Sequence, residues 1–178
     1  EMLNLARKKM GSISKISDLL LGDIEFLPFR NGSFNLLLCI STLHYFSSPY
    51  AALMEFSRVL KKGGIFIYAD VTIHEMDTEG FMDKLEKAIS AAHGGYHRPS
   101  EVRSLMEKCG VGVAKIKTIL YRKSYESLIE DKAKYFNIEP QTLQEFLRRA
   151  TRKQSALYKI EENTMTLFYT IISGLKKE

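Results

Sequence analysis

The sequence predicts a doubly wound α/β fold, and three neighbouring stretches carry this prediction. Residues 34–40, FNLLLCI, form an apolar run with almost no polar member, which is typical of a strand covered on both faces. Residues 48–63 have the pattern of a helix with both ends marked, and residues 65–71, IFIYADV, form a second covered strand. A strand, a helix and a strand joined by tight connections form a right-handed crossover unit, the building block of a parallel sheet.

The composition agrees with one ordinary domain spanning residues 1–178. Of the 178 residues, 45% are hydrophobic, and 26 basic against 21 acidic residues give a mixed surface with a formal charge of +5, which does not favour a nucleic-acid partner. The two cysteines lack the spacing of a metal site or a disulfide framework. No apolar stretch reaches the ~20 residues of a membrane helix or forms a signal peptide. We therefore expect a soluble, cytoplasmic protein without a membrane span.

The first predicted element is a helix at the N-terminus, because apolar residues recur at helical spacing from Met2 to Met10. We interpret the short apolar run KISDLLLGD, residues 15–23, as the strand that follows, with Asp23 at its carboxyl end. The next strand is the covered run at 34–40.

The helix after this strand carries signals at both ends. Ser48 is the expected N-cap and Pro49 the first helical residue. Lys61 and Lys62 are expected in the last turn, with Gly63 as the left-handed cap.

The rest of the chain alternates helices, strands and one loop. Helices are expected at 78–92, 100–110, 124–136 and 140–158, strands at 113–121 and 164–176, and a loop, HGGYHRP, at 93–99. The third and fourth of these helices form a helical insert at about 124–158 between the last two strands.

Two groups of polar residues are expected at one edge of the sheet. In an open α/β sheet, ligands bind at the carboxyl ends of the strands. Asp23 follows one expected strand, and Ser41 to His44 follow the next. If both strands point the same way, these residues line one crevice. A carboxylate there can accept from an amino group or hydroxyl, while the small Ser41 and Thr42 let a ligand approach the backbone.

A longer motif surrounds these residues. Residues 22–46, GDIEFLPFRNGSFNLLLCISTLHYF, followed by ALMEFSRVLKKGGIFIYAD at 52–70, resemble the middle of the class I S-adenosylmethionine-dependent methyltransferases. The shared pattern is G-D-x-x-x-L-P-F, a buried strand, L-H-[HY]-[FL] and E-x-x-R-V-L-K-x-G-G. It is closest to the small-molecule branch typified by quinone-biosynthesis C-methyltransferases, and the N-terminal helix and the last strand fit more loosely.

The resemblance implies a Rossmann-like fold with strand order 3-2-1-4-5-7-6, an antiparallel last strand and S-adenosyl-L-methionine as the cofactor. In such a site the Asp23 carboxylate accepts from the adenine amino group, the Ile24 N–H donates to the ring, and Met2 covers an adenine face. Ile40, Ser41 and His44 then line the methionine side of the cofactor and the methyl-transfer channel. Residues 72–98 form a lid over the acceptor. The implied cofactor contacts are Met2, Asp23, Ile24, Ile40, Ser41 and His44.

The sequence departs from the family at one point. The glycine-rich D/E-x-G-x-G-x-G loop and the acidic residue that holds the ribose are not found in residues 1–178. We therefore expect the first two strands of the family fold to be missing, which makes the chain N-terminally truncated. Their absence would open a gap of about 14 Å, three inter-strand steps of ~4.8 Å, beside the fourth strand. Either the third strand closes onto the fourth, or a second copy or an outside segment fills the gap.

Methyl transfer from a sulfonium needs mainly alignment and exclusion of water, and a general base only when the acceptor is weakly acidic. The candidate catalytic residues are His44 and Asp70, because each follows a strand's carboxyl end. His44 is explained equally well as a loop-packing histidine, and Asp70 and Asp23 as turn residues. No metal is expected, since the glycine pair between His93 and His97 breaks a helix and no third ligand is nearby.

Three functions follow from these observations, in decreasing order of support. The first is transfer of a methyl group from S-adenosylmethionine to a small-molecule acceptor, with weakened cofactor binding in this chain. The second is a non-catalytic methyltransferase remnant, acting as a homodimeric interaction or regulatory module because exposed strand edges need a partner. The third, an RNA methyltransferase, rests on LRRATRK at 147–153, a kind of run that is more often a solvated helix face.

Overall fold

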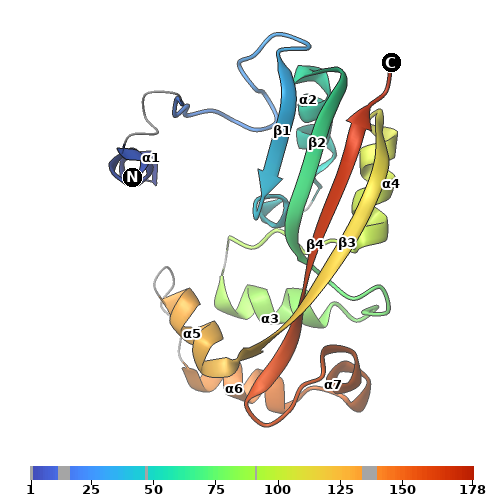
Figure 1. Cartoon of the computed structure of the whole chain (residues 1–178). Helices are drawn as coiled ribbons and strands as arrows, with labels where there is room; N and C mark the ends of the chain where they lie inside the picture. The colour runs from blue at the N-terminus through green and yellow to red at the C-terminus, as the bar shows by residue number, and fades with distance from the viewer. Residues whose placement is uncertain (1, 12–16, 47, 91, 134–139) are drawn as a thin grey trace.

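The computed structural model describes residues 2–11, 17–46, 48–90, 92–133 and 140–178, and a four-stranded sheet runs through the described chain (Figure 1). The strand order is β1-β2-β4-β3. The strands are β1 (Phe34–Ile40), β2 (Leu60–Thr72), β3 (Val111–Ser124) and β4 (Thr164–Lys176).

The directions of the strands confirm the expected mixed sheet. Strand β1 pairs with β2 in parallel, with Leu38 opposite Ile67. Strand β4 is antiparallel to both β2 and β3, so β1, β2 and β3 point the same way and the last strand runs against them. This order and these directions are those of the 4-5-7-6 part of the family sheet. The Rossmann-like α/β fold class is therefore confirmed.

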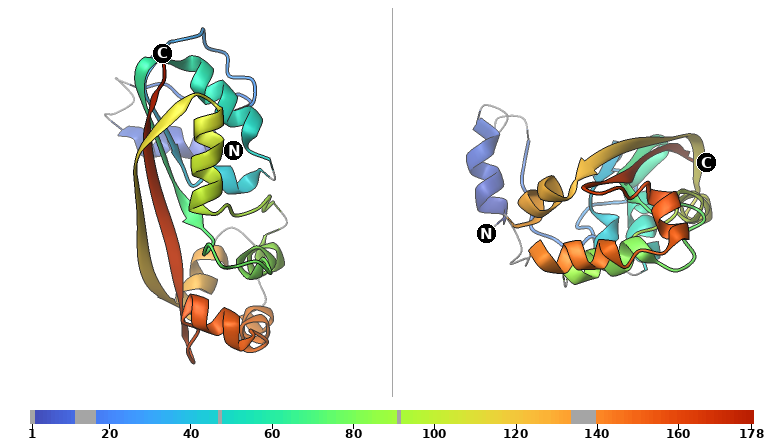
Figure 2. Two further views of the ribbon diagram at one scale, coloured as in Figure 1. Left: turned by 90° about the vertical axis from the view of Figure 1, so that its right-hand side faces the viewer. Right: turned by 90° about the horizontal axis from the view of Figure 1, so that it is seen from below.

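Two helices cover one face of this sheet. Helix α2 (Tyr50–Val59) connects β1 to β2, helix α4 (Pro99–Lys108) leads into β3, and both lie on the same side (Figure 2). They pack on a core that includes Leu43, Leu53, Phe56, Phe66, Tyr68, Met106 and Ile172. On the other face of β1, Leu36, Leu38 and Ile40 are 49%, 52% and 54% exposed. The alternation follows from the strand period of two, which sends neighbouring side chains to opposite faces.

The ends of α2 and α4 differ from the sequence prediction. Pro49, not Ser48, is the N-cap of α2, and no side-chain bond caps this end. The chain is already extended at Leu60, which pairs with β1, so the lysines that follow lie in β2 instead of a last helical turn. Gly63 has a positive φ of 71°, but within the strand. Helix α4 begins one residue before the expected cap, Ser100, because Pro99 opens it.

The insert between β3 and β4 lies at the far end of the long β3–β4 pair (Figure 1). It holds α5 (Tyr125–Ala133), α6 (Pro140–Arg148) and α7 (Arg152–Tyr158), which share a second core with α3 (Phe81–Ile89). The single helix expected at 140–158 was wrong. Thr151 accepts from the Gln154 N–H and the Gln154 side chain accepts from the Thr151 N–H, a capping box that starts a new helix. The expected helix beyond Ala133 falls on residues outside the described part.

The N-terminal segment does not join the sheet. Helix α1 (Met2–Met10) stands apart from it (Figures 1 and 2), and the strand expected at 15–23 is not formed over its described residues, 17–23. Leu20 and Leu21 are 55% and 86% exposed. A strand is stable only when a neighbour takes up its backbone bonds, and within the described residues β1 pairs with β2 alone. Of the two alternatives, closure of this segment onto β1 is therefore not seen in the described residues.

Candidate functional site

The candidate site lies where β1 ends, in residues 41–46, which we call the strand-end turn. The Ser41 N–H donates to the Ala69 carbonyl over 2.8 Å, which continues the pairing of β1 with β2 by one residue. Ser41 then adopts a φ of 49°, a strained conformation for a residue with a side chain. Leu43 opens a short 3-10 helix, η2 (Leu43–Tyr45), and is fully buried in the first core. The positive φ of Ser41 and the buried Leu43 therefore constrain the path of the strand-end turn.

Asp70, near the end of β2, is the partner of this turn. Its side chain is 1% exposed and accepts from three donors: His44 Nδ1 at 2.9 Å, the Val71 N–H at 2.8 Å and the Thr42 N–H at 3.1 Å. A carboxylate only accepts, so Nδ1 of His44 carries the hydrogen and Nε2 remains for a ligand. The His44 side chain is 16% exposed. The structure thus brings the two predicted catalytic residues into direct contact.

The negative charge of Asp70 affects the groups behind it. Burial raises the pKa of the Cys39 thiol to about 12, with a further rise from Asp70 and a smaller opposing effect of the Thr42 hydroxyl. Burial and then Asp70 also raise the pKa of the Tyr68 hydroxyl. Both groups therefore stay neutral near pH 7.

The loop that follows α3 forms the other wall of the site. The His44 ring lies 4.3 Å from the ring of Tyr45, 5.7 Å from that of Tyr96 and 6.1 Å from that of His93, measured between centroids. His93 and Tyr96 belong to the segment expected as a lid, residues 72–98. Sequence reasoning had not identified His93 as a neighbour of His44, since nothing in the motif connects two segments so far apart in the chain.

Asp23 has different surroundings. Its side chain is exposed, and one of its oxygens accepts from the Glu25 N–H over 2.9 Å, while its carbonyl accepts from the Phe26 N–H over 3.1 Å. Residues 23–26 thus form a local turn, the Asp23 turn, whose Ile24 packs against the first core. Among the described residues, no bond joins the Asp23 turn to the strand-end turn. The geometry is that of the turn residue that sequence reasoning had kept as the alternative.

Two other predicted cofactor contacts, Ile40 and Met2, lie outside the Asp23 turn. Ile40 is the last residue of β1 and is half exposed on the open face of the sheet. Met2 begins α1, but its side chain lies outside the described part of the chain. The described structure therefore groups Ile40, Ser41, His44 and Asp70 at the strand ends, while Asp23 and Ile24 lie in a separate turn.

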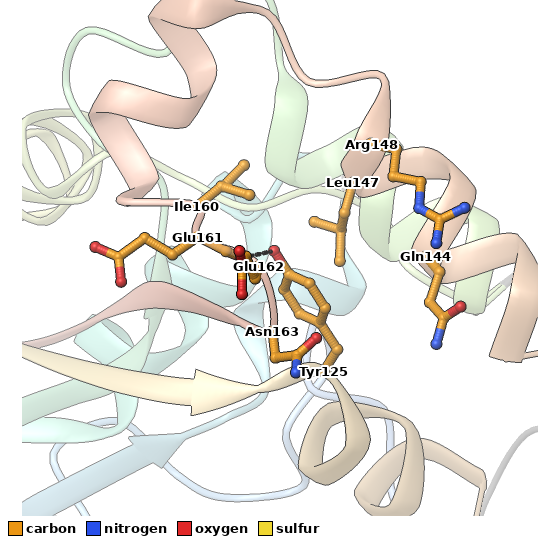
Figure 3. A pocket seen from close by; sticks show the side chains of 8 residues that line it. All are labelled: Tyr125, Gln144, Leu147, Arg148, Ile160, Glu161, Glu162 and Asn163. Carbon is orange, nitrogen blue, oxygen red and sulfur yellow. Dashed lines mark hydrogen bonds between the residues drawn. The ribbon is translucent and has the colours of Figure 1, made fainter.

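Two hollows in the described part of the chain contain none of the predicted catalytic or cofactor-binding residues. A cavity of about 250 Å³ lies in the insert region, between the starts of α5 and β4 and the end of α6, and Tyr125 donates its hydroxyl to the Glu161 carbonyl at its wall (Figure 3). A groove of about 410 Å³ beside α4 is lined in part by Pro49, His97 and Lys108. In the described residues, no three metal-binding side chains gather at any point, and no helix has the length and hydropathy to cross a bilayer.

Known proteins share the sequence motif that contains the two turns. The Methyltransferase domain family matches residues 1–68, which contain both turns. Malonyl-[acyl-carrier protein] O-methyltransferase of Yersinia pestis is 32% identical over 96 residues, 54% of this chain and 32% of that protein. Arginine-hydroxylase NDUFAF5, mitochondrial, of Danio rerio is 27% identical over 115 residues, 62% of this chain and 36% of that protein. The chain thus spans about a third of the length of these curated relatives.

The fold agrees with the sequence match. The crystal structure of the YcgJ protein from Bacillus subtilis has a TM-score of 0.87 to this chain at 23% identity, covering 99% of this chain and 79% of that one. Such low identity shows a common fold and does not transfer an activity. Residues 1–68 thus match the Methyltransferase domain family, and the chain shares its fold with the YcgJ protein.

Proposed function

We propose that this chain carries the acceptor side of an S-adenosylmethionine-dependent methyltransferase that acts on a small molecule. The observation that carries the proposal is the contact of His44 with the buried Asp70 at the carboxyl ends of β1 and β2. Ligands of open α/β sheets bind at this edge. A histidine whose Nδ1 is held by a buried carboxylate presents Nε2 in a fixed direction, as a proton acceptor must.

The residues present fit the cofactor at two places. Asp23 keeps one carboxylate oxygen without a partner among the described residues, and the adjoining Ile24 N–H is likewise unbonded there. An acceptor next to a donor complements the amino group and ring nitrogen on one edge of adenine. At the other place, Ser41 brings backbone close to the methionine side without bulk. When bound, S-adenosylmethionine supplies an electrophilic methyl group on a sulfonium.

The roles of the chain's own residues follow from their contacts. Asp70 orients the His44 imidazole, and Nε2 accepts the proton that an acceptor hydroxyl or amine loses as its heteroatom is methylated. The rings of Tyr45, His93 and Tyr96 limit the water that reaches this nitrogen. The weak positive surplus and its mixed distribution favour a small acceptor over a nucleic acid.

Cofactor binding tests this function directly. We expect a Kd on the order of 1 mM for S-adenosylhomocysteine, about −4 kcal/mol, because residues 1–178 contain no glycine-rich loop to hold the ribose and carboxylate. Saturation-transfer NMR detects binding of this strength and should show signals from adenine protons. The Asp23→Ala variant should weaken them, whereas Asp18→Ala, at another exposed aspartate, should not. Absence of any signal would contradict the function, and micromolar binding by titration calorimetry would contradict the weakening alone.

A second candidate function is a non-catalytic module that binds a second copy of this chain. The half-exposed Leu36, Leu38 and Ile40 lie on β1, whose outer edge has no partner strand within the described residues, and exposed apolar edge strands tend to associate. Light scattering coupled to size exclusion should then give a dimer that Leu38→Glu converts to a monomer. Leu21→Glu, at an exposed leucine away from the sheet, is the control. A wild-type monomer at all concentrations would exclude this alternative.

A further inference from the structure

The loop after α3 holds the strand-end turn through its backbone. The N–H groups of Gly94 and Gly95 both donate to the carbonyl of His44, over 2.9 and 3.0 Å. The η2 helix itself has only the turn bonds from Tyr45 to Thr42 and from Phe46 to Leu43. Since a single 3-10 turn is weakly held by its own bonds, the two outside donors decide where the His44 backbone lies.

Gly94 must be a glycine for this contact, whereas Gly95 need not be. A Cβ atom on Gly94 would lie 2.5 Å from the carbonyl oxygen of Tyr45 and 2.7 Å from the carbonyl carbon of Phe46, closer than real Cβ atoms come to backbone. A Cβ atom on Gly95 would meet nothing within 4 Å. The two backbones therefore touch at Gly94, and the neighbouring glycine supplies a matched comparison.

Asp83 of α3 fixes both ends of this loop. One of its oxygens accepts from His93 Nε2 over 2.9 Å and from the Tyr96 N–H over 2.6 Å. Burial raises the pKa of the Asp83 carboxyl, but the bonds from His93 and Tyr96 outweigh it and keep this pKa below its ordinary value. The Tyr96 hydroxyl adds a bond to Glu86, one turn further along the same helix. The loop from 93 to 96, the glycine loop, is therefore anchored on a rigid element.

We propose that Gly94 and Asp83 are positioning residues for His44. Asp83 holds the glycine loop, the loop holds the His44 carbonyl, and the turn then presents the imidazole to Asp70 and to the acceptor. The proposal deepens the proposed function and rests on it for the role of His44 in methyl transfer. Its physical basis is that a displacement of about 1 Å in a catalytic group can cost on the order of 100-fold in rate.

The experiment compares Gly94→Ala with Gly95→Ala in the full chain, using NMR of the histidine side chains. In the wild type, the His44 Nδ1 proton should give a signal protected by Asp70. We expect Gly94→Ala to lose or shift this signal, while Gly95→Ala keeps it. A folded Gly94→Ala variant with an unchanged His44 signal would overturn the proposal.

A second pair of variants keeps the test decisive if Gly94→Ala fails to fold. Asp83→Ala removes both loop bonds and should alter the His44 signal in the same way, whereas Lys84→Ala, its exposed neighbour, should not. An unaltered His44 in Asp83→Ala would count against the proposal as directly.

A kinetic measurement joins the inference to the proposed function. With an acceptor in hand, Gly94→Ala should lower kcat by roughly 10- to 100-fold with little change in the KM for the cofactor, because it misplaces a group without removing a cofactor contact. Gly95→Ala should stay within about twofold of the wild type on the same reasoning. If the wild type transfers no methyl group, the proposed function fails, while the NMR comparison still decides whether the glycine loop positions His44.

Discussion

The Asp23 turn and the strand-end turn belong to one sequence motif, but they differ in strand pairing and in burial. The strand-end turn follows a strand that is paired with β2, and its bonds converge on a carboxylate that is 1% exposed. The Asp23 turn follows a segment without a strand partner in the described chain, and its carboxylate is exposed with one local bond. Residues that follow a paired strand are therefore held in a defined geometry, whereas the residues after an unpaired segment keep only local bonds.

Thiol chemistry should show this contrast most strongly. Because the pKa of Cys39 is raised from 9.0 to about 12, its thiolate fraction at neutral pH falls about a thousandfold, and burial limits access further. An Asp23→Cys variant should instead react at the rate of an exposed thiol. Mass spectrometry after timed labelling with iodoacetamide distinguishes the two sites. Similar rates at Cys39 and at the new cysteine would show that the strand-end region is as open as the Asp23 turn.

Removing the two carboxylates should also have unequal effects on stability. Asp70→Ala leaves three donors without their acceptor, two of them backbone N–H groups, and should lower the free energy of unfolding by about 3 kcal/mol. Asp23→Ala removes one exposed local bond and should change it by less than about 1 kcal/mol. Urea denaturation followed by circular dichroism measures both. Equal losses would contradict the difference between the turns.

Asp77 extends the comparison to the second core. This carboxylate is 2% exposed and accepts from the Phe81 N–H and the Tyr158 hydroxyl, over 3.1 and 2.6 Å. Asp77→Ala should cost about 2 kcal/mol, because α3 loses a bond at its first turn and the tyrosine hydroxyl loses its acceptor. The same denaturation experiment applies, with Glu79→Ala as the exposed control. A cost as small as that of the control would show that this network does not stabilise α3.

The smallest effect is expected in the pH dependence of stability. The folded-state pKa of Asp83 lies below its ordinary value of 3.8, so its carboxylate stabilises the fold above about pH 4. That contribution is lost as the pH falls through the folded-state pKa, because the unfolded chain takes up the proton first. The melting temperature of Asp83→Asn should therefore fall less steeply than that of the wild type below pH 4. Parallel curves would show that the bonds to Asp83 do not favour its charged form.

Much of the fold could be predicted because its signals are local. The covered runs of β1 and β2, the crossover helix between them and the order of the described strands follow from apolar patterning and from the family motif. The Thr151 capping box, with Gln154 three residues later, is an equally local signal for the start of α7. The strand at 15–23 had the right composition, but a strand depends on a neighbour, and its own sequence does not contain one.

The candidate site could be predicted only in part, for the same reason. His44 and Asp70 were assigned separately from their positions at strand ends, and the structure joins them over 2.9 Å. The bonds that Asp83 accepts from His93 and Tyr96 connect a helix to a glycine-rich loop ten and thirteen residues further on. No periodic pattern in the sequence indicates these bonds. Contacts of this kind arise from packing between elements, which residue spacing does not encode.

Mapping the backbone amide shifts that S-adenosylhomocysteine causes is the most direct test of a functional site at the ends of β1 and β2. We expect shifts at Ser41, Thr42 and His44 and at the Ile24 amide, with smaller ones at Asp70. Shifts confined to the cavity around Tyr125, or no shifts in the strand-end turn at a ligand concentration that saturates the chain, would contradict this expectation.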